Sequence, residues 1–216
     1  MISATRMGEQ IAAQLRHEII AGDLRPGDLM RLAPLAERFD VSITPVREAL
    51  AVLERQGLVV GRPHRGFYVA DLSPEDIEDV YALHAFMAGR LTEHAVGQLS
   101  DHELDELEKI DEEIRQATLA GDKDGAGDLN HELHRRIMQA SGSMLLLRFL
   151  RETTPFVGRK TGSDVPGWAE VRIEGHRAII DALRGGDGRL ARALMEEHVL
   201  RSGRHAADFA RAKRSS

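Results

Sequence analysis

Apolar residues recur every three or four positions through most of the chain, which is the spacing that predicts amphipathic helices. In the first third of the chain this pattern predicts helices over residues 7–21, 33–39 and 45–56. Thr44 before Pro45 is typical of an N-cap and a first helical residue. Two short apolar runs follow, Leu58–Val60 and Phe67–Ala70, and the residues between them predict a turn. Helices followed by a β-hairpin predict a winged helix-turn-helix.

After residue 73 the pattern predicts helices alone. Ser73 and Pro74, followed by two acidic residues, are typical of a helix start. The spacing predicts helices over residues 74–97, 101–120, 122–140, 144–158, 168–185 and 188–210. We therefore expect a mainly α protein of two domains, a winged helix-turn-helix with a small β-hairpin over residues 1–72 and an all-α helical bundle over residues 73–216.

Composition narrows the class of protein. The 216 residues carry 29 Lys and Arg against 35 Asp and Glu, a net charge of -6, yet residues 1–70 carry nine Arg against eight acidic residues. The absence of Cys excludes disulfides, thiol catalysis and cysteine zinc sites. No apolar run approaches the roughly 18 residues that span a bilayer, so we expect a cytoplasmic protein. An aromatic content of 4% disfavours a stacking surface for single-stranded nucleic acid.

The predicted second helix of the helix-turn-helix carries side chains suited to duplex DNA. The N-terminal residues of such a recognition helix reach the major groove, where an arginine such as Arg47 can bind guanine with two hydrogen bonds. The arginines at the tip of the hairpin could meet phosphate. We expect DNA contacts from Ser42, Thr44, Val46, Arg47, Arg62, His64, Arg65 and Gly66. In the alternative, the unit is a plain packing module and Arg47 lies on a solvated face.

Three segments of this region resemble a known family. Residues 35–39 (LAERF), 41–50 (VSITPVREAL) and 53–59 (LERQGLV) are similar to the GntR family of bacterial transcription regulators, and RPGD at residues 25–28 matches the family's turn after its first helix. The resemblance implies binding to a double-stranded DNA operator. Ile43 stands where family members usually carry an arginine that helps to contact DNA, so that contact is absent here.

Four polar residues of the second domain are spaced as metal ligands would be. Asn130 and His134 are four positions apart and share a helix face. His176 and His198 lie eleven positions before and after Asp187, at the turn between the last two predicted helices. Residues equidistant from the turn of an antiparallel helical hairpin face each other, so both imidazoles should point inward. Three imidazoles and one side-chain oxygen suit a divalent ion such as zinc, nickel or manganese.

Two other interpretations of these histidines stay open. Each could be a hydrogen-bonded core residue, in a DNA-binding protein without a metal. The chain could also be a three-histidine metal-dependent hydrolase, in which the ion activates water and Glu174 acts as the base. Substrate turnover would distinguish such an enzyme from a regulator.

The second domain also resembles part of the same family. Residues 130–134 (NHELH), 141–143 (SGS), 175–180 (GHRAII) and 195–199 (MEEHV) are similar to the FCD ligand-binding domain of the FadR branch. The resemblance implies that Asn130, His134, His176 and His198 hold a metal ion in a helical cavity. It also implies that this metal helps to receive a small carboxylate effector.

Two departures from the FCD pattern affect the expected chemistry. The family carries Asp where Asn130 stands, so the site loses one negative charge and we expect weaker metal binding or an added anion. His84 stands where an arginine often reaches the effector, and we expect His84 to bind the effector instead. From the whole sequence we expect a ligand-responsive repressor, and not an enzyme, that binds a pseudo-palindromic operator as a homodimer.

Overall fold

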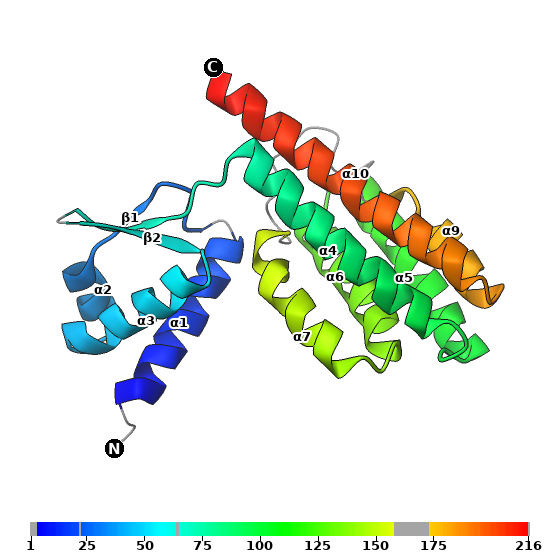
Figure 1. The fold of residues 1–216 in the computed structure, drawn as a ribbon, viewed down its shortest axis with the longest axis horizontal. Coiled ribbons are helices and arrows are strands. Elements are labelled where there is room, and N and C mark those ends of the chain that lie inside the picture. The colour runs from blue at the N-terminus through cyan, green and yellow to red at the C-terminus, as the bar shows by residue number, and fades with distance from the viewer. Residues whose placement is uncertain (1–3, 22, 64, 158–172, 216) are drawn as a thin grey trace. The chain divides into compact units, whose positions relative to one another are not determined.

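The computed structural model describes residues 4–21, 23–63, 65–157 and 173–215 of the chain. The chain divides into two compact units, residues 1–72 and residues 73–216. Helices make up most of both units, and the strands form one small sheet in the first (Figure 1). The mainly α fold, a winged helix-turn-helix followed by an all-α bundle, is therefore confirmed. Within the described ranges, no helix is both long enough and apolar enough to cross a bilayer.

The first unit combines three helices with a three-stranded antiparallel sheet. The helices are α1 Ala4–Ala21, α2 Leu32–Arg38 and α3 Ile43–Arg55, and the strands are β1 Leu29–Met30, β2 Val59–Arg62 and β3 Gly66–Val69. The strand order is β1-β3-β2, with Val60 opposite Tyr68. The sequence predicted β2 and β3 but missed β1, because two residues are too few for an alternating pattern to be visible.

The three helices of this unit are joined by an apolar core and by an ion pair whose acidic partner is buried. Helix α3 packs against α1 and α2, and its fully buried residues are Val46, Ala49, Leu50 and Leu53. Glu18 of α1 is buried and binds Arg38 of α2. The Arg38 guanidinium lowers the pKa of the Glu18 carboxyl, so the pair stays ionised and ties α1 to α2.

Helix α3 begins two residues earlier than the sequence predicted. Ser42 is its N-cap and Ile43 its first helical residue, so the prediction of Thr44 as the N-cap and Pro45 as the first residue is wrong. Pro45 is the third helical residue. Its missing N–H costs no hydrogen bond there, because the first four N–H groups of any helix lack an intrahelical acceptor.

The second unit is a bundle of helices (Figure 1). Its helices are α4 Pro74–Ala95, α5 Asp101–Leu119, α6 Lys123–Ala140, α7 Met144–Thr153, α9 His176–Arg184 and α10 Gly188–Ser215, and the 3-10 helix η1 covers Thr154–Phe156. Helices α4 and α5 begin at capping boxes formed by Ser73 with Asp76 and by Ser100 with Glu103. These caps explain why both starts were predictable from the sequence.

Two of the predicted helices end or begin elsewhere. The helix expected over residues 144–158 ends at Thr153, because Pro155 cannot donate to the helical ladder and the chain tightens into η1. In the helix expected over residues 168–185, Gly175 adopts a left-handed φ of 102°, so α9 starts afresh at His176. Residues 168–172, including Trp168, lie outside the described residues.

Helices α4 and α10 pack along each other and form the largest part of this core. Tyr81 of α4 is fully buried and faces Gly203 of α10. A Cβ atom at residue 203 would lie 2.5 Å from the Cβ of Tyr81, so only glycine allows the helices to approach this closely. This close packing fixes α10, and with it His198, against the rest of the bundle.

Candidate metal centre and DNA-binding surface

Three histidines from three helices meet inside the second unit. His134 lies on α6, His176 is the first residue of α9, and His198 lies on α10. One ligand nitrogen from each lies within 4.8 Å of the other two. The ring centroids are 5.2 Å apart for His134 and His176, and 4.7 Å apart for His176 and His198. The structure thus brings together the three histidines that the sequence grouped.

The turn between α9 and α10 places His176 opposite His198, as their equal distance from Asp187 suggested. His198 lies on the buried face of α10. Leu190 is 47% exposed, and the buried stripe contains Ala191, Met195 and Val199. His198 belongs to this stripe because it follows Ala191 by seven positions, close to two helical turns.

Backbone atoms at the start of α9 orient His198. The Nδ1 of His198 lies 3.0 Å from the carbonyl oxygen of Glu174. A carbonyl can only accept, so Nδ1–H donates and the lone pair of the neutral ring is on Nε2. Arg201 donates to the same carbonyl at 2.7 Å and to the Glu174 carboxylate at 2.8 Å. Glu174 is therefore an exposed ion-pair partner, which does not favour its role as a catalytic base.

His176 is bound on its other side by an acidic residue that the sequence analysis did not select. Its Nδ1 lies 3.1 Å from Oδ1 of Asp111 on α5, and its buried Nε2 has no hydrogen-bond partner among the described residues. Asp111 belongs to an acidic run, yet it follows Leu107 by four positions and precedes Ile114 by three. That place in the apolar stripe of α5 was the available signal that Asp111 is buried.

Asn130 lies one helical turn before His134 on α6 and is partly buried. Its Oδ1 is enclosed and lacks a hydrogen-bond partner among the described residues. An enclosed amide oxygen without a donor is costly, as is the lone imidazole nitrogen of His176. Both atoms are of the kinds that bind first-row divalent metals, so this donor set fits such an ion.

Burial keeps the imidazoles in the form that binds metals. The pKa of His198 falls to about 3, mainly through burial and further through the nearby His176. Burial, together with the nearby His198 and His176, lowers the pKa of His134 well below its usual value. Both rings are consequently neutral at pH 7, and a neutral ring offers a lone pair to a cation.

His84, the expected effector-binding residue, lies on α4 and is buried. Its Nδ1 is 2.8 Å from Oγ1 of Thr153, whose hydroxyl is also within 2.8 Å of the Leu150 carbonyl oxygen. Burial, with a smaller effect from His131, lowers the pKa of His84 to about 4. His84 therefore carries no positive charge at neutral pH and cannot replace an arginine as a charged partner for a carboxylate.

In the first unit, α3 exposes three of the four residues predicted to read DNA. Ser42, Thr44 and Arg47 are exposed, and the Ser42 side chain makes no capping hydrogen bond. Val46 is 0% exposed in the core, so the prediction that it contacts DNA is wrong. The reason is helical geometry, because Val46 shares a face with Ala49, Leu50 and Leu53 rather than with Arg47.

The wing exposes the expected arginines. Arg62 of β2 and Arg65 in the turn are exposed, as is Gly66 at the start of β3. The Arg62 guanidinium lies 4.5 Å from the ring centroid of Tyr68, a stacked arrangement that steadies the side chain. His64 lies outside the described residues. The wing thus presents cationic side chains of the kind that bind phosphate.

Comparison with known proteins assigns both units to families. Residues 7–69 match the family "Bacterial regulatory proteins, gntR family", and residues 79–201 match the "FCD domain" family. The two matches together span most of the chain.

Curated relatives and a solved structure match along nearly the whole chain. The "uncharacterized HTH-type transcriptional regulator YdhC" of Bacillus subtilis is 27% identical over 88% of this chain and 85% of that protein. The "probable D-xylose utilization operon transcriptional repressor" of Paenarthrobacter nicotinovorans is 27% identical over 92% and 88%. The structure of E. coli McbR/YncC has a similar fold, with a TM-score of 0.74, 24% identity, and coverage of 93% and 95%. The named relatives are transcription regulators, not enzymes.

The lowered histidine pKa values predict that the metal-free protein loses stability in mild acid. Folded His84 has a pKa of about 4 and the free side chain about 6.5, so the unfolded state binds more protons between these values. His84 therefore makes its full contribution to the free energy of unfolding above about pH 6.5. This contribution, about 3 kcal/mol at most, is lost as the pH falls toward 4. Urea unfolding in EDTA between pH 7.5 and 5.0 measures this loss.

The matched variants are His84→Gln and His102→Gln, the second at an exposed site on α5. His84→Gln should flatten the dependence of unfolding free energy on pH, and His102→Gln should leave it as in the wild type. An unchanged slope in His84→Gln would contradict the assignment.

Proposed function

Because the chain belongs to the GntR family of bacterial transcription regulators and carries an FCD domain, we propose that it is a repressor controlled by a small molecule at a metal site. The observation that carries this proposal is the meeting of His134, His176 and His198, with ligand nitrogens within 4.8 Å of one another. The same chain presents Arg47 on an exposed helix for DNA. We expect it to act in the cytoplasm, where its operator lies.

The proposed metal ligands are the three histidines and Asn130. Zinc fits this set best and nickel is an alternative, because imidazole suits both, and manganese is a further alternative that prefers oxygen ligands such as Oδ1 of Asn130. The bound ion would supply a positive charge and open coordination positions inside an otherwise apolar bundle. His134, His176 and His198 hold it from three helices, so its loading would favour the packed arrangement of α6, α9 and α10.

A small organic acid is the proposed effector. His84 is neutral at pH 7, so the metal is the group that would offset the charge of a carboxylate in this bundle. The effector can alter DNA binding only if it binds two states of the protein with different affinity. We infer that its binding releases the operator. One relative is named a probable transcriptional repressor, which supports repression rather than activation.

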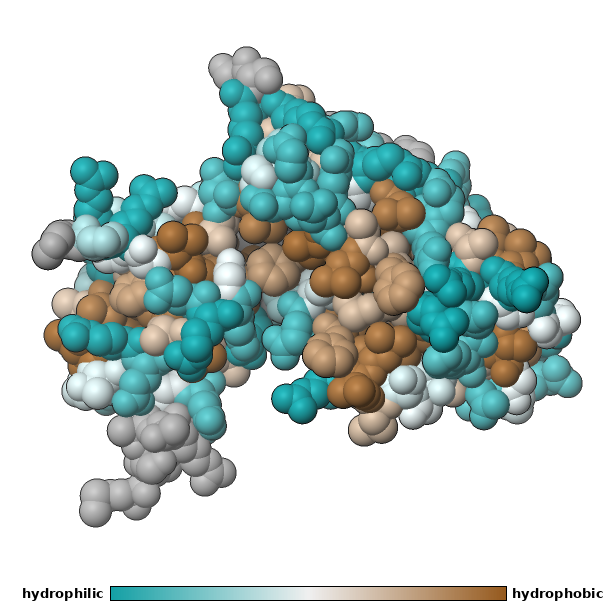
Figure 2. Space-filling view, in the orientation of Figure 1, coloured by the Kyte–Doolittle hydropathy of each residue, from teal (hydrophilic) through white to brown (hydrophobic). Residues whose placement is uncertain are grey.

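The proposed oligomer is a homodimer, since a two-fold pair of recognition helices matches a pseudo-palindromic operator. The second unit exposes large apolar side chains on two helices that pack together, α4 and α7. They are Leu83 and Phe86 on α4, and Met144, Leu145 and Phe149 on α7. Figure 2 shows hydrophobic surface gathered over these two helices. A patch of this kind is typical of an interface, and a second copy would cover it.

Untagged protein should bind one divalent ion per chain, and His134→Ala should abolish that binding. Within the described part of the chain His134 makes no hydrogen bond, so its removal deletes a ligand without breaking one. Zinc at one hundred times its dissociation constant should raise the melting temperature by about 5–10 °C. His102→Ala is the control and should respond as the wild type does. Wild-type protein that retains no metal in atomic absorption would contradict the proposal.

Arg47→Ala should weaken specific DNA binding by about 5-fold to 150-fold, because a bidentate arginine–guanine contact contributes about 1–3 kcal/mol. The probe is a duplex selected from a random library by the wild-type protein, and fluorescence anisotropy measures the affinity. Arg55→Ala is the control, because Arg55 is exposed at the opposite end of α3. Equal losses in both variants would indicate a purely electrostatic effect, and no loss would contradict recognition by α3.

Light scattering should show a dimer for the wild type and a monomer for Phe149→Glu, because the new carboxylate would be buried in the proposed interface. Leu119→Glu is the control. Leu119 is also an exposed apolar residue, but it ends α5 and lies outside the α4–α7 patch. A dimer that survives Phe149→Glu would place the interface elsewhere.

A further inference from the structure

We propose that Asp111 is a positioning residue for the metal site and supplies the negative charge that Asn130 does not provide. This inference rests on the proposed metal site. Asp111 lies on α5, which carries none of the four proposed ligands, and its neighbours Glu112 and Glu113 are exposed acidic residues. Instead it is 6% exposed and lies 3.1 Å from Nδ1 of His176.

The hydrogen bond from His176 determines where the lone pair of that ring lies. An ionised carboxylate only accepts, so Nδ1–H of His176 donates to Asp111 and the neutral ring keeps its lone pair on Nε2. Nε2 is enclosed and has no partner in the described part of the chain, and the ring centroids of His176 and His198 are 4.7 Å apart. Metal-bound histidines usually donate their second nitrogen to a carboxylate or carbonyl in this way.

The charges of the cluster support the same assignment. Three neutral imidazoles and the Asn130 amide have no formal charge, so a divalent cation would bring two positive charges to a neutral site. Among the described residues of the second unit, Asp111 is the buried acidic side chain. A buried carboxylate without a nearby cation is unfavourable, and so is a cation without a nearby anion. Each therefore offsets the cost of burying the other.

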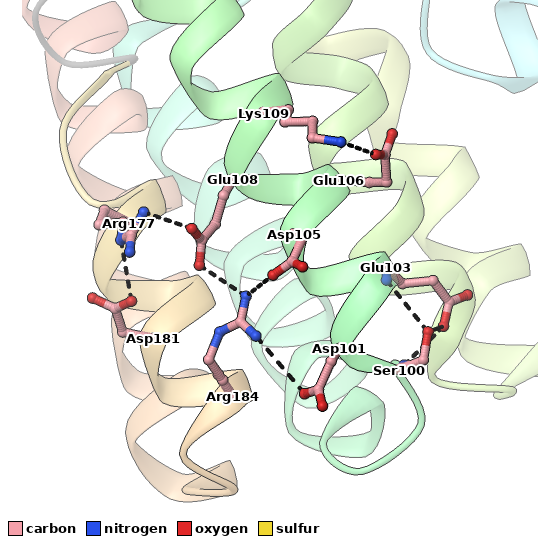
Figure 3. Close-up of polar contacts among 10 residues, drawn as sticks. All are labelled: Ser100, Asp101, Glu103, Asp105, Glu106, Glu108, Lys109, Arg177, Asp181 and Arg184. Atoms are coloured by element: carbon pink, nitrogen blue, oxygen red, sulfur yellow. Dashed lines mark hydrogen bonds and ion pairs between the residues drawn. The ribbon is translucent and has the colours of Figure 1, made fainter.

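A series of ion pairs keeps α5 and α9 in the register that joins Asp111 to His176. Arg184 of α9 binds Asp105 at 2.7 Å and Glu108 at 2.9 Å, and Arg177 binds Glu108 at 2.9 Å (Figure 3). Asp111 follows Glu108 by three positions and lies on the same face of α5. Such exposed pairs are individually weak, but a shift of α9 by one turn, about 5.4 Å, would break all of them together.

The same contact could exist for another reason, as an ion pair between Asp111 and a protonated His176 with no metal. That alternative predicts a loss of stability when the charge of Asp111 is removed, but no effect on metal binding. It also predicts that a new carboxylate at residue 130 would not compensate for the lost charge. These differences define the experiment.

The test compares zinc affinity, by competition with a chelator, in untagged full-length wild type, Asp111→Asn, and Asp111→Asn with Asn130→Asp. Asn keeps an acceptor oxygen but removes the charge, so affinity should fall about 10-fold to 100-fold. Asn130→Asp should restore most of it, because it returns one negative charge to the site. Glu113→Gln is the control, an exposed acid of α5 outside these ion pairs, and should bind zinc as the wild type does. Cobalt absorption spectra and metal-free unfolding are recorded for every variant.

The outcomes separate this inference from the proposal beneath it. If the wild-type protein binds no metal, both the proposed metal site and this inference are overturned. Wild-type binding with equal affinity in Asp111→Asn overturns the inference and leaves the metal site standing. Weakened zinc binding in Asp111→Asn that Asn130→Asp fails to restore, with metal-free stability lowered in parallel, shows that Asp111 affects metal binding through the fold and not through its charge, and also overturns the inference.

Discussion

The second unit is constrained by three imidazoles that share one enclosed space. Polar nitrogens in an apolar interior need partners, and two of these rings obtain one through Nδ1, from the Asp111 carboxylate and the Glu174 carbonyl. Those bonds leave the opposite nitrogens directed away from the groups that orient them. The helices α5, α9 and α10 must therefore keep their relative positions, because a small shift of any one would leave a polar atom without its partner.

Two features outside the histidine cluster help to keep these helices in their relative positions. They are the close approach of α4 to α10 and the ion pairs between α5 and α9. Gly203 lets α10 lie against the Tyr81 ring, and the arginines of α9 hold the acidic face of α5. Neither feature touches an imidazole. The geometry of the cluster is thus a property of the packed bundle, which explains how His176 can serve as a ligand at the very first residue of a short helix.

Periodicity predicted the fold class, the helix starts at capping residues, and the facing pair His176 and His198. It failed where a tertiary contact decides the outcome. Asp111 has acidic neighbours in sequence, a pattern typical of a solvated position, yet the hydrogen bond from His176 offsets the cost of its burial. Val46 was assigned to DNA because it lies near Arg47, although the helical period turns it into the core. Strand β1 and the break at Gly175 depend on partners or backbone angles that no apolar pattern encodes.

The Glu174 carbonyl receives hydrogen bonds from both His198 and Arg201, two residues before His176, which begins α9. Every amino acid has this oxygen, so the side chain at residue 174 can vary without changing the anchor for His198. Gly175 cannot vary in this way, because its φ of 102° determines the path of the backbone next to the Glu174 carbonyl. The orientation of the His198 ring therefore depends partly on the path of the backbone and not on the side chain at residue 174. A comparison of side-chain functional groups alone would not detect a change in that path.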